Sequence, residues 1–248
     1  MTKLSAGIII IGDEILSGRT KDTNANFIAK KLLKSGIHLK EIRTIQDNKK
    51  IIINTIKEFK DLYTYVFTTG GIGPTHDDIT SESVSRALNK KYTYNKEAYD
   101  ILEKYYSKKN FNSGRKKMAK MPQTAELIYN PLTVAPGFKI ENIYVFPGVP
   151  KIMKIMFSNL LKEIRKGKPK NVITINTNLF ESMMAKKLSI IQKKNPKCSI
   201  GSYPYFDFIK KKGGVKIVLS SWTLKNLDHI IKEVRDMISL LGGKSFIV

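Results

Sequence analysis

The feature that most constrains the fold is a continuous apolar run, Ala6 to Ile11, followed directly by Gly12-Asp13-Glu14. A strand that is apolar at every position has both faces buried, and such strands belong to parallel sheets that helices cover. We therefore expect a buried strand over 4–11 in an α/β fold. The run is far too short to span a bilayer, and no signal-peptide cleavage pattern follows Lys3. These features predict a cytoplasmic protein with no membrane partner.

Helix and strand patterns alternate after this strand. Apolar residues at helical spacing predict a helix from Asp22, a candidate N-cap, to Gly36, a left-handed stop. A strand, a helix capped by Asp47 or Asn48, and another strand complete a βαβαβ unit. Such units bind ligands in a crevice at the carboxyl ends of their strands. We expect strands over 37–45, 63–68 and 142–146, helices over 78–89, 96–109 and 152–167, and loops with short strands over 112–135.

The stretch Lys166-Gly167-Lys168-Pro169-Lys170 combines small, charged and helix-breaking residues, which is typical of a linker. We therefore expect a first domain over 1–166 and a second over 171–248. A βαββα unit of the second domain's size forms a two-layer α+β module. Its elements are predicted in the order strand, helix, strand, strand and helix, over 171–178, 179–194, 197–203, 214–221 and 224–241.

A glycine-rich turn, Thr69 to Thr80, follows the third predicted strand and opens a helix. Its glycines allow backbone N–H groups to approach an oxyanion, and the helix presents the positive end of its dipole to the same point. Asp77 and Asp78, with Thr75 and Thr80 beside them, offer hard oxygen ligands of the kind that Mg²⁺ uses when it also holds a phosphate. The turn therefore predicts a site for a nucleotide that carries a pyrophosphate.

Two further turns lie at the carboxyl ends of predicted strands. One runs from Gly12 to Gly18 after the first strand, and the other is Pro147-Gly148-Val149-Pro150. Because the carboxyl ends of parallel strands share one edge of a sheet, we expect both turns to meet the glycine-rich turn in one site.

The formal net charge of +23 raises the possibility of nucleic-acid binding. Arginine, which grips phosphates and reads bases, is scarce, whereas lysine is spread along the whole chain. We therefore interpret the lysines as solvated surface that steers anionic ligands, and a nucleic-acid partner is not expected. The basic run Arg115-Lys116-Lys117 is either such a solvated loop or a cover for a phosphate.

The remaining distinctive side chains favour structural roles. The one cysteine, Cys198, excludes an intramolecular disulfide and a cysteine-based zinc site, and we expect it to be a small buried hydrophobe. Trp222 and the cluster Tyr203-Pro204-Tyr205-Phe206 are expected to lie in the core or at an interface of the second domain, with stacking on a ligand as the alternative.

Four motifs together resemble the molybdopterin-binding MoaB/Mog family. They are IGDEILSGRTKDTN from Ile11, TGGIGPTHDDIT from Thr69, APGF from Ala135 and FPGVP from Phe146. The sequence is most similar to the branch that contains the amino-terminal half of competence/damage-inducible protein A (CinA) and the amino-terminal domain of long-form FAD synthetase. It departs from CinA-type sequences at Lys151-Ile152-Met153, where an acidic residue and methionine usually follow the Pro-Gly-Val-Pro turn.

This resemblance implies a three-layer α/β/α domain with a mostly parallel sheet, plus a small α+β C-terminal domain. It implies that a nucleotide or pterin binds across the three turns, with Mg²⁺, Mn²⁺ or Co²⁺ near the aspartates, and that the chain forms a homo-oligomer. In the CinA and FAD synthetase branches the implied activity is hydrolysis of a nucleotide pyrophosphate such as ADP-ribose or FAD. The alternatives are molybdopterin adenylyl transfer, as in the Mog branch, and a nucleotide-binding module without catalysis.

Combined with the turns, the resemblance assigns residue roles. The candidate metal ligands are Asp77 and Asp78, and the candidate catalytic residues are Asp13, Glu14, His76, Asp77 and Asp78. The candidate substrate-binding residues are Gly12, Asp22, Thr23, Asn24, Thr69, Gly70, Gly71, Gly73, Pro74, Thr75, Thr80, Pro147, Gly148 and Pro150. Backbone N–H groups of Gly70, Gly71 and Gly73 are expected to bind the anion. Helix capping by Asp22 or Asp78, a structural role for Glu14, a plain turn at Gly148 and simple hydrogen bonding by His76 remain open alternatives.

Overall fold

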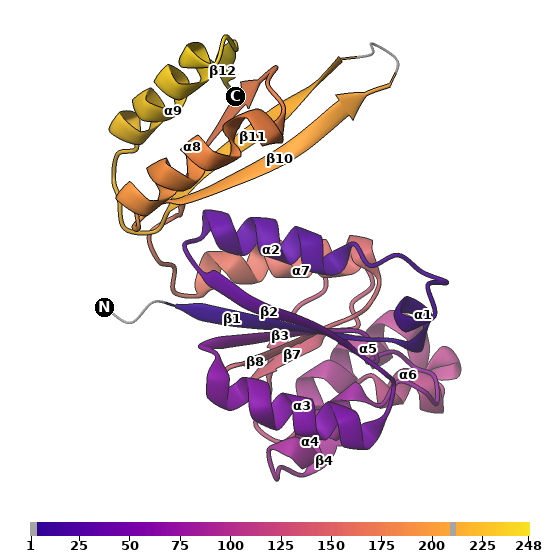
Figure 1. Ribbon diagram of the computed structural model, residues 1–248. Helices are drawn as coiled ribbons and strands as arrows, with labels where there is room; N and C mark the ends of the chain where they lie inside the picture. Colours follow the sequence, from indigo (N-terminus) through magenta and orange to yellow (C-terminus); the bar gives the residue numbers. More distant parts are fainter. Residues whose placement is uncertain (1–3, 209–211) are drawn as a thin grey trace. The chain divides into compact units, whose positions relative to one another are not determined.

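The computed structural model describes residues 4–208 and 212–248. The chain forms two compact units, Met1–Gly167 and Lys168–Val248 (Figure 1). Among the described residues, no helix is long and apolar enough to cross a membrane.

The first unit is built on a six-stranded sheet. Its four consecutive strands β2, β1, β3 and β8 are parallel, and β7 and β6 continue the sheet in antiparallel fashion beyond β8. The strands, in sheet order, are β2 (His38–Ile45), β1 (Ser5–Ile11), β3 (Tyr65–Thr69), β8 (Ile143–Phe146), β7 (Gly137–Ile140) and β6 (Glu126–Ile128). The predicted βαβαβ order and the mostly parallel sheet are confirmed.

Helices cover both faces of this sheet (Figure 1). The side chains of β1 alternate, with Ile8 and Ile10 in one buried cluster and Ile9 and Ile11 in the other. The first cluster also contains residues of α2 (Asn24–Lys34) and α7 (Pro150–Glu163). The second cluster contains residues of α3 (Lys49–Leu62), α4 (Thr80–Ala87) and α5 (Lys96–Asn110). The strand predicted from the continuous apolar run is therefore buried on both faces, as expected. The three-layer α/β/α architecture is also confirmed.

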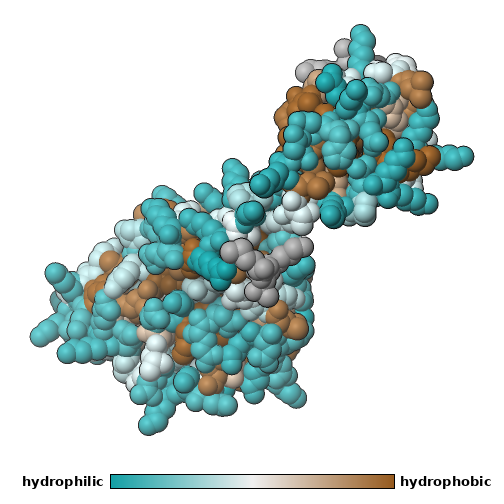
Figure 2. Space-filling model, turned by 90° about the vertical axis from the view of Figure 1, so that its left-hand side faces the viewer, coloured by the Kyte–Doolittle hydropathy of each residue, from teal (hydrophilic) through white to brown (hydrophobic). Residues whose placement is uncertain are grey.

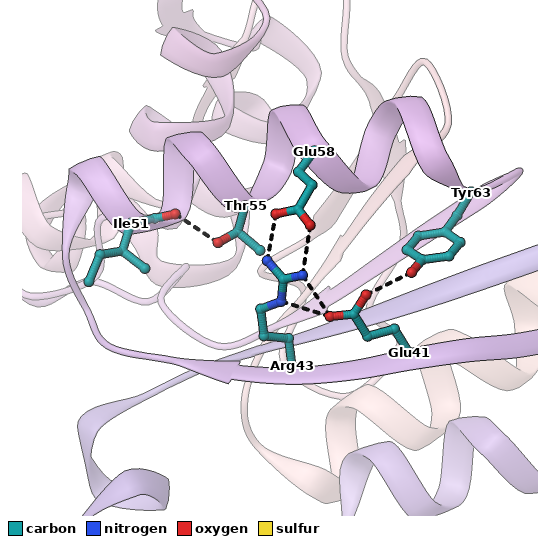
Figure 3. Close-up of polar contacts among 6 residues, drawn as sticks. All are labelled: Glu41, Arg43, Ile51, Thr55, Glu58 and Tyr63. Atoms are coloured by element: carbon teal, nitrogen blue, oxygen red, sulfur yellow. Dashed lines mark hydrogen bonds and ion pairs between the residues drawn. The ribbon is translucent and has the colours of Figure 1, made fainter.

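A polar network fixes the edge strand β2 to helix α3 (Figure 3). The two Nη atoms of Arg43 donate to the carboxylate of Glu58 at 2.6 and 2.8 Å, and its Nε donates to Glu41 at 2.8 Å. The bonds to Glu58 are the main reason that the pKa of Arg43 is raised. The guanidinium also lies 4.7 Å from the ring centroid of Phe59. Tyr63 donates to Glu41 at 2.7 Å, and burial is the main cause that raises its pKa to about 12.

The segment 112–135 is more ordered than expected. It contains a short helix, α6 (Ser113–Lys117), which begins where the side chain of Asn112 accepts the N–H of Arg115 at 3.0 Å. It also contains β5 (Lys120–Pro122), which pairs with β4 (Tyr92–Tyr94) in a separate two-stranded sheet. Neither α6 nor β4 was predicted, because elements of three to five residues are too short to show periodicity.

The second unit contains one strand more than predicted. Its elements are β9 (Asn171–Thr177), α8 (Glu181–Lys194), β10 (Ser199–Asp207), β11 (Lys212–Ser221), α9 (Asp228–Leu240) and β12 (Ser245–Ile247). The sheet order is β10-β11-β9-β12, with β12 antiparallel to β9. The small α+β domain is confirmed, and its pattern is βαββαβ rather than βαββα.

Side chains of the second unit only partly follow the expectations. Cys198 is buried, with 1% of its surface exposed, and lies in the core as expected. Tyr203, Tyr205 and Phe206 do not lie in that core, since they are 58%, 38% and 50% exposed. Of the two expected placements, the core is therefore excluded for these aromatic residues, and an interface stays a prediction. They belong to β10, which is an edge strand of its sheet, and an edge strand has fewer neighbours to cover it.

Candidate functional site

The three predicted turns meet in one pocket at the carboxyl ends of the parallel strands. Its volume is about 440 Å³. The side chains and backbone that line it come from the ends of β1, β2, β3 and β8: Ile11, Gly12, Glu14, Asp47, Gly70, Gly71, Ile72, Gly73, Asp77, Asp78, Pro147, Gly148 and Val149. The parallel order of these strands places the turns together, as a doubly wound sheet requires.

The glycine-rich turn has a backbone that only glycine adopts readily. Gly70 and Gly71 have φ angles of 105° and 68°, in the left-handed region. The N–H of Gly70 donates to the carbonyl of Phe146 at 3.1 Å, so the expectation that this group binds an anion is wrong. Within residues 4–208 and 212–248, no protein acceptor takes the N–H of Gly71 or of Gly73. Both glycines line the pocket, so their N–H groups are its candidate donors.

The two aspartates of the turn converge on one hydroxyl group. Thr75 Oγ1 lies 2.5 Å from Asp77 Oδ1 and 2.6 Å from Asp78 Oδ2, and the N–H of Thr75 also donates to Asp78 Oδ2 at 2.8 Å. The hydroxyl bond is the main cause that lowers the pKa of Asp77. Asp78 does not cap the following helix, because its carboxylate is turned back toward Thr75 and Ile79 occupies the N-cap position. A hydroxyl has only one proton, so it cannot donate to both carboxylates at once.

Asp47 lines the pocket although its role was not predicted. The sequence offered Asp47 and Asn48 as alternative helix caps, and the structure uses Asn48, whose side chain accepts the N–H groups of Lys50 and Ile51. Asp47 Oδ2 instead accepts the N–H of Asp13 at 3.0 Å. Burial is the main cause that raises the pKa of Asp47, and nearby carboxylates add to the effect. Its position just beyond the carboxyl end of β2, with Gln46 between them, was the signal that could have identified it.

The residues at the start of α2 contribute structural contacts. Asp22 accepts the N–H groups of Asn24 and Ala25, each at 3.1 Å, so its carboxylate satisfies the start of α2 in the manner of a helix cap. Asn24 is buried, and its Nδ2 donates to the carbonyl of Gly148 at 2.8 Å. This bond joins the start of α2 to the turn at Gly148. The Oδ1 atom of Asn24 is buried and has no hydrogen-bond partner among the described residues.

The other predicted residues divide between the pocket and its surroundings. Those that line the pocket are Gly12, Glu14, Gly70, Gly71, Gly73, Asp77, Asp78, Pro147 and Gly148. Asp13, Thr23, Pro74, Thr75 and Pro150 are exposed outside the lining, and Thr69 and Thr80 are buried beneath it. Pro150 is the first residue of α7. His76 lines a neighbouring pocket and not this one, so its placement does not support a role as the base here.

Asp77 and Asp78 fit a metal ion only with help from a ligand. Over the described ranges 4–208 and 212–248, no three His, Cys, Asp or Glu side chains are arranged to hold a metal ion by themselves. Mg²⁺ is commonly bound by one or two carboxylates together with substrate phosphates and waters. The two aspartates match that pattern, because both line the pocket and one oxygen of each lies within hydrogen-bond distance of the same Thr75 hydroxyl.

Comparison with known proteins identifies both units. A family profile described as "probable molybdopterin binding domain" matches residues 7–166, and one described as "FAD synthase, middle domain" matches residues 171–241. A protein of Archaeoglobus fulgidus is 35% identical over 232 residues, which are 94% of this chain and 97% of that protein. A "CinA-like protein" of Fusobacterium nucleatum is 31% identical over 95% of this chain, and the chain covers 59% of that protein's length.

A solved structure supports the same assignment for the first unit. The crystal structure of CinA from Thermoplasma acidophilum, described as of unknown function, is 31% identical and aligns with a TM-score of 0.61. The alignment covers 64% of this chain and 96% of that chain. The chain therefore belongs to the molybdopterin-binding MoaB/Mog family, with CinA-like relatives and a second unit of the FAD synthase middle-domain type.

Proposed function

We propose that the first unit binds a nucleotide or pterin through its phosphates in the pocket of the three turns, and that it hydrolyses a nucleotide pyrophosphate of the ADP-ribose or FAD type. The observation that carries this proposal is the combination of two backbone N–H groups without a protein acceptor, on Gly71 and Gly73, with four carboxylates that line the same pocket. The donors suit phosphate oxygens, and the carboxylates suit a divalent cation.

A cation fits the charge of this pocket. Four carboxylates line it, those of Glu14, Asp47, Asp77 and Asp78, and no lysine or arginine of the described chain does so. A pyrophosphate would be repelled by these carboxylates unless a cation lay between them. When bound, Mg²⁺, Mn²⁺ or Co²⁺ would neutralise the phosphate charge and polarise the phosphorus. Asp77 and Asp78 would hold it from the protein side.

The protein's own groups would then position the reactants. The N–H groups of Gly71 and Gly73 would orient the phosphate oxygens, and Glu14 or Asp47 would accept a proton from the attacking water. That water forms a new bond to one phosphorus, and the bridging P–O bond breaks. The products are two phosphate monoesters: AMP with ribose 5-phosphate from ADP-ribose, or AMP with FMN from FAD.

Incubation of the purified chain with ADP-ribose and with FAD tests this proposal. We expect AMP release that requires one of the three cations and stops in EDTA. The variant Asp77→Ala/Asp78→Ala should lose activity, whereas Asp61→Asn, which removes an exposed carboxylate on α3, should not change it. Failure to release AMP with any of the three cations would refute the hydrolase proposal, and persistence of activity in the double variant would refute the metal site.

Molybdopterin adenylyl transfer is the second candidate, and the match of residues 7–166 to the molybdopterin-binding family favours it. In that reaction the phosphate of molybdopterin attacks the α-phosphorus of ATP, and pyrophosphate leaves. Assays with ATP and molybdopterin would give adenylylated molybdopterin if this candidate is correct. Calorimetric binding of ADP-ribose or FAD without any product would instead favour a binding module without catalysis.

A further inference from the structure

A second pocket adjoins the candidate site. Its volume is about 390 Å³, and Asp78 lines both pockets. A ligand held in the first pocket is therefore next to the second. The remaining residues that line the second pocket come from α3, the glycine-rich turn, α4, β4, α6 and β5: Lys49, His76, Ile79, Glu82, Tyr92, Tyr94, Ser113, Lys117 and Lys120.

The second pocket supplies the cationic side chains that the first pocket lacks. Of its three lysines, Lys49 forms an ion pair with Glu82 at 2.7 Å. Glu82 also pairs with Arg86 at 2.7 Å, so this carboxylate is balanced by two cations. Neither Lys117 nor Lys120 forms an ion pair in the part of the chain that the structure describes. The pocket therefore presents two ammonium groups that are not committed to a salt bridge.

Lys117 connects the second pocket to the glycine-rich turn. Its Nζ donates to the carbonyl of Thr75, the residue whose hydroxyl contacts Asp77 and Asp78. An ammonium group has three N–H donors, so two remain for a ligand after this bond is made. The backbone bond also limits the conformational freedom that Lys117 would lose on binding an anion.

Aromatic and hydroxyl groups complete the pocket. The Nζ of Lys120 lies 4.7 Å from the ring centroid of Tyr94 and 5.8 Å from that of Tyr92, so the rings restrict its position. Burial raises the pKa of Tyr92 to about 12, which keeps its hydroxyl protonated at neutral pH. Tyr92 and Ser113 are therefore neutral donors beside the two ammonium groups. Ammonium and hydroxyl donors together match the oxygens of a phosphate group.

We propose that this second pocket binds a phosphate monoester at the end of the ligand whose pyrophosphate occupies the first pocket, with Lys117 and Lys120 as its cationic contacts. The identity of that ligand rests on the proposed function. The proposal thus extends the substrate class, beyond ADP-ribose and FAD, to nucleotide pyrophosphates that carry an additional phosphate monoester, whereas ADP-ribose and FAD would occupy the first pocket alone. The two pockets differ in charge, since four carboxylates and no lysine or arginine line the first, whereas three lysines face the carboxylates of Asp78 and Glu82 in the second.

Titration with inorganic phosphate in EDTA, followed by phosphorus NMR, tests the second pocket alone. Without a divalent cation the carboxylates of the first pocket repel phosphate, so binding should report the second pocket. We expect Lys117→Gln and Lys120→Gln each to weaken binding about tenfold, the effect of losing one charged hydrogen bond. The matched control is Lys57→Gln, which removes the same charge from an exposed position on α3 and should leave binding unchanged.

Two results would overturn the proposal. If Lys120→Gln binds phosphate as tightly as the parent chain, the second pocket is not the phosphate site. If Lys57→Gln weakens phosphate binding as much as the pocket variants do, the binding reflects general attraction to a chain of net charge +23. If Lys117→Gln unfolds because it loses the bond to Thr75, then Lys120→Gln decides the question, since among the described residues the Nζ of Lys120 has no hydrogen bond or ion pair to lose and lies near two aromatic rings. No turnover is required, so lysine-dependent phosphate binding without AMP release would refute the hydrolase and leave this proposal intact.

Discussion

Replacing Gly70 with alanine tests whether the backbone of the glycine-rich turn determines the stability of the site. Gly70 has a φ of +105°, and a Cβ at this position would lie 2.1 Å from the carbonyl oxygen of Ile11. That oxygen belongs to the end of β1, which pairs with β2 on one side and β3 on the other. Since β1 is held on both sides, it cannot move away without disturbing the sheet.

The expected cost has two parts. A left-handed conformation costs a residue with a side chain about 1–2 kcal/mol, and forcing extra atoms into a packed region costs about 1–3 kcal/mol. Gly70→Ala should therefore lower the free energy of unfolding by about 2–5 kcal/mol. For a unit of this size the melting temperature should fall by about 4–20 °C, since each kcal/mol corresponds to about 2–4 °C.

Gly148→Ala is the matched control on the facing turn. Its Cβ would lie 3.4 Å from the Cα of Gly70, an ordinary contact, and Gly148 is not among the residues with positive φ. We expect a change of about 0.5 kcal/mol or less in unfolding free energy. Calorimetric melting of both variants measures the difference, and equal melting temperatures for Gly70→Ala and the parent chain would refute the reasoning. If Gly148 contacts the ligand, Gly148→Ala should still weaken ADP-ribose binding; if it is only a turn residue, binding should be retained.

Three other changes test the site and the second unit. In EDTA, Asp47→Asn should raise the melting temperature at about pH 7, because the raised pKa of Asp47 makes its ionisation oppose folding. This increase in melting temperature should shrink as the pH falls through the folded-state pKa of Asp47 and vanish below the ordinary pKa of 3.8. An increase that stays constant with pH would contradict this account. Asn24→Ala removes the bond to the carbonyl of Gly148 and should lower the free energy of unfolding by about 1–3 kcal/mol in a urea titration. Cys198 should react with a thiol reagent only when the second unit unfolds, because burial hides the thiol and raises its pKa, and rapid labelling of the folded chain would contradict this.

Long apolar and periodic segments allowed most of the fold to be predicted. The strand from Ser5 to Ile11 is apolar at nearly every position, and α3 has a clear apolar stripe, so local sequence alone specified both. The short elements β4, α6 and β12 have no such pattern. The pairing of β12 with β9 brings together residues about 70 positions apart, such as Ile247 with Ile175. Contacts over that separation depend on the completed fold, which single-sequence periodicity does not report.

In the candidate site too, some residues could be predicted from the sequence and others could not. The glycines and aspartates of the central turn were recognisable because a double glycine, Gly-Pro-Thr and a double aspartate in one turn are improbable by chance and resemble a motif of the MoaB/Mog family. Asp47 was read as a possible helix cap, because aspartate at the start of a helix is most often a cap. Its actual role depends on β2 lying beside β1, which places Asp47 against the N–H of Asp13. Lys120 was not singled out either, since its position depends on the unpredicted pairing of β5 with β4.

The distribution of charge explains how a strongly basic chain can contain an acidic pocket. Hydrophilic side chains cover most of the face drawn in Figure 2, which agrees with lysines that are solvated on the surface. Their field would draw anions toward the protein from solution. Because salt screens this field over about 8–10 Å, it would contribute little to a phosphate bound beside Asp77 and Asp78. The carboxylates next to the phosphate would dominate its electrostatic energy, because the energy between two charges rises as their separation falls. On the proposed function, the net charge of +23 would therefore not replace a bound cation in the first pocket, whereas Lys117 and Lys120 are proposed to bind a phosphate without one in the second.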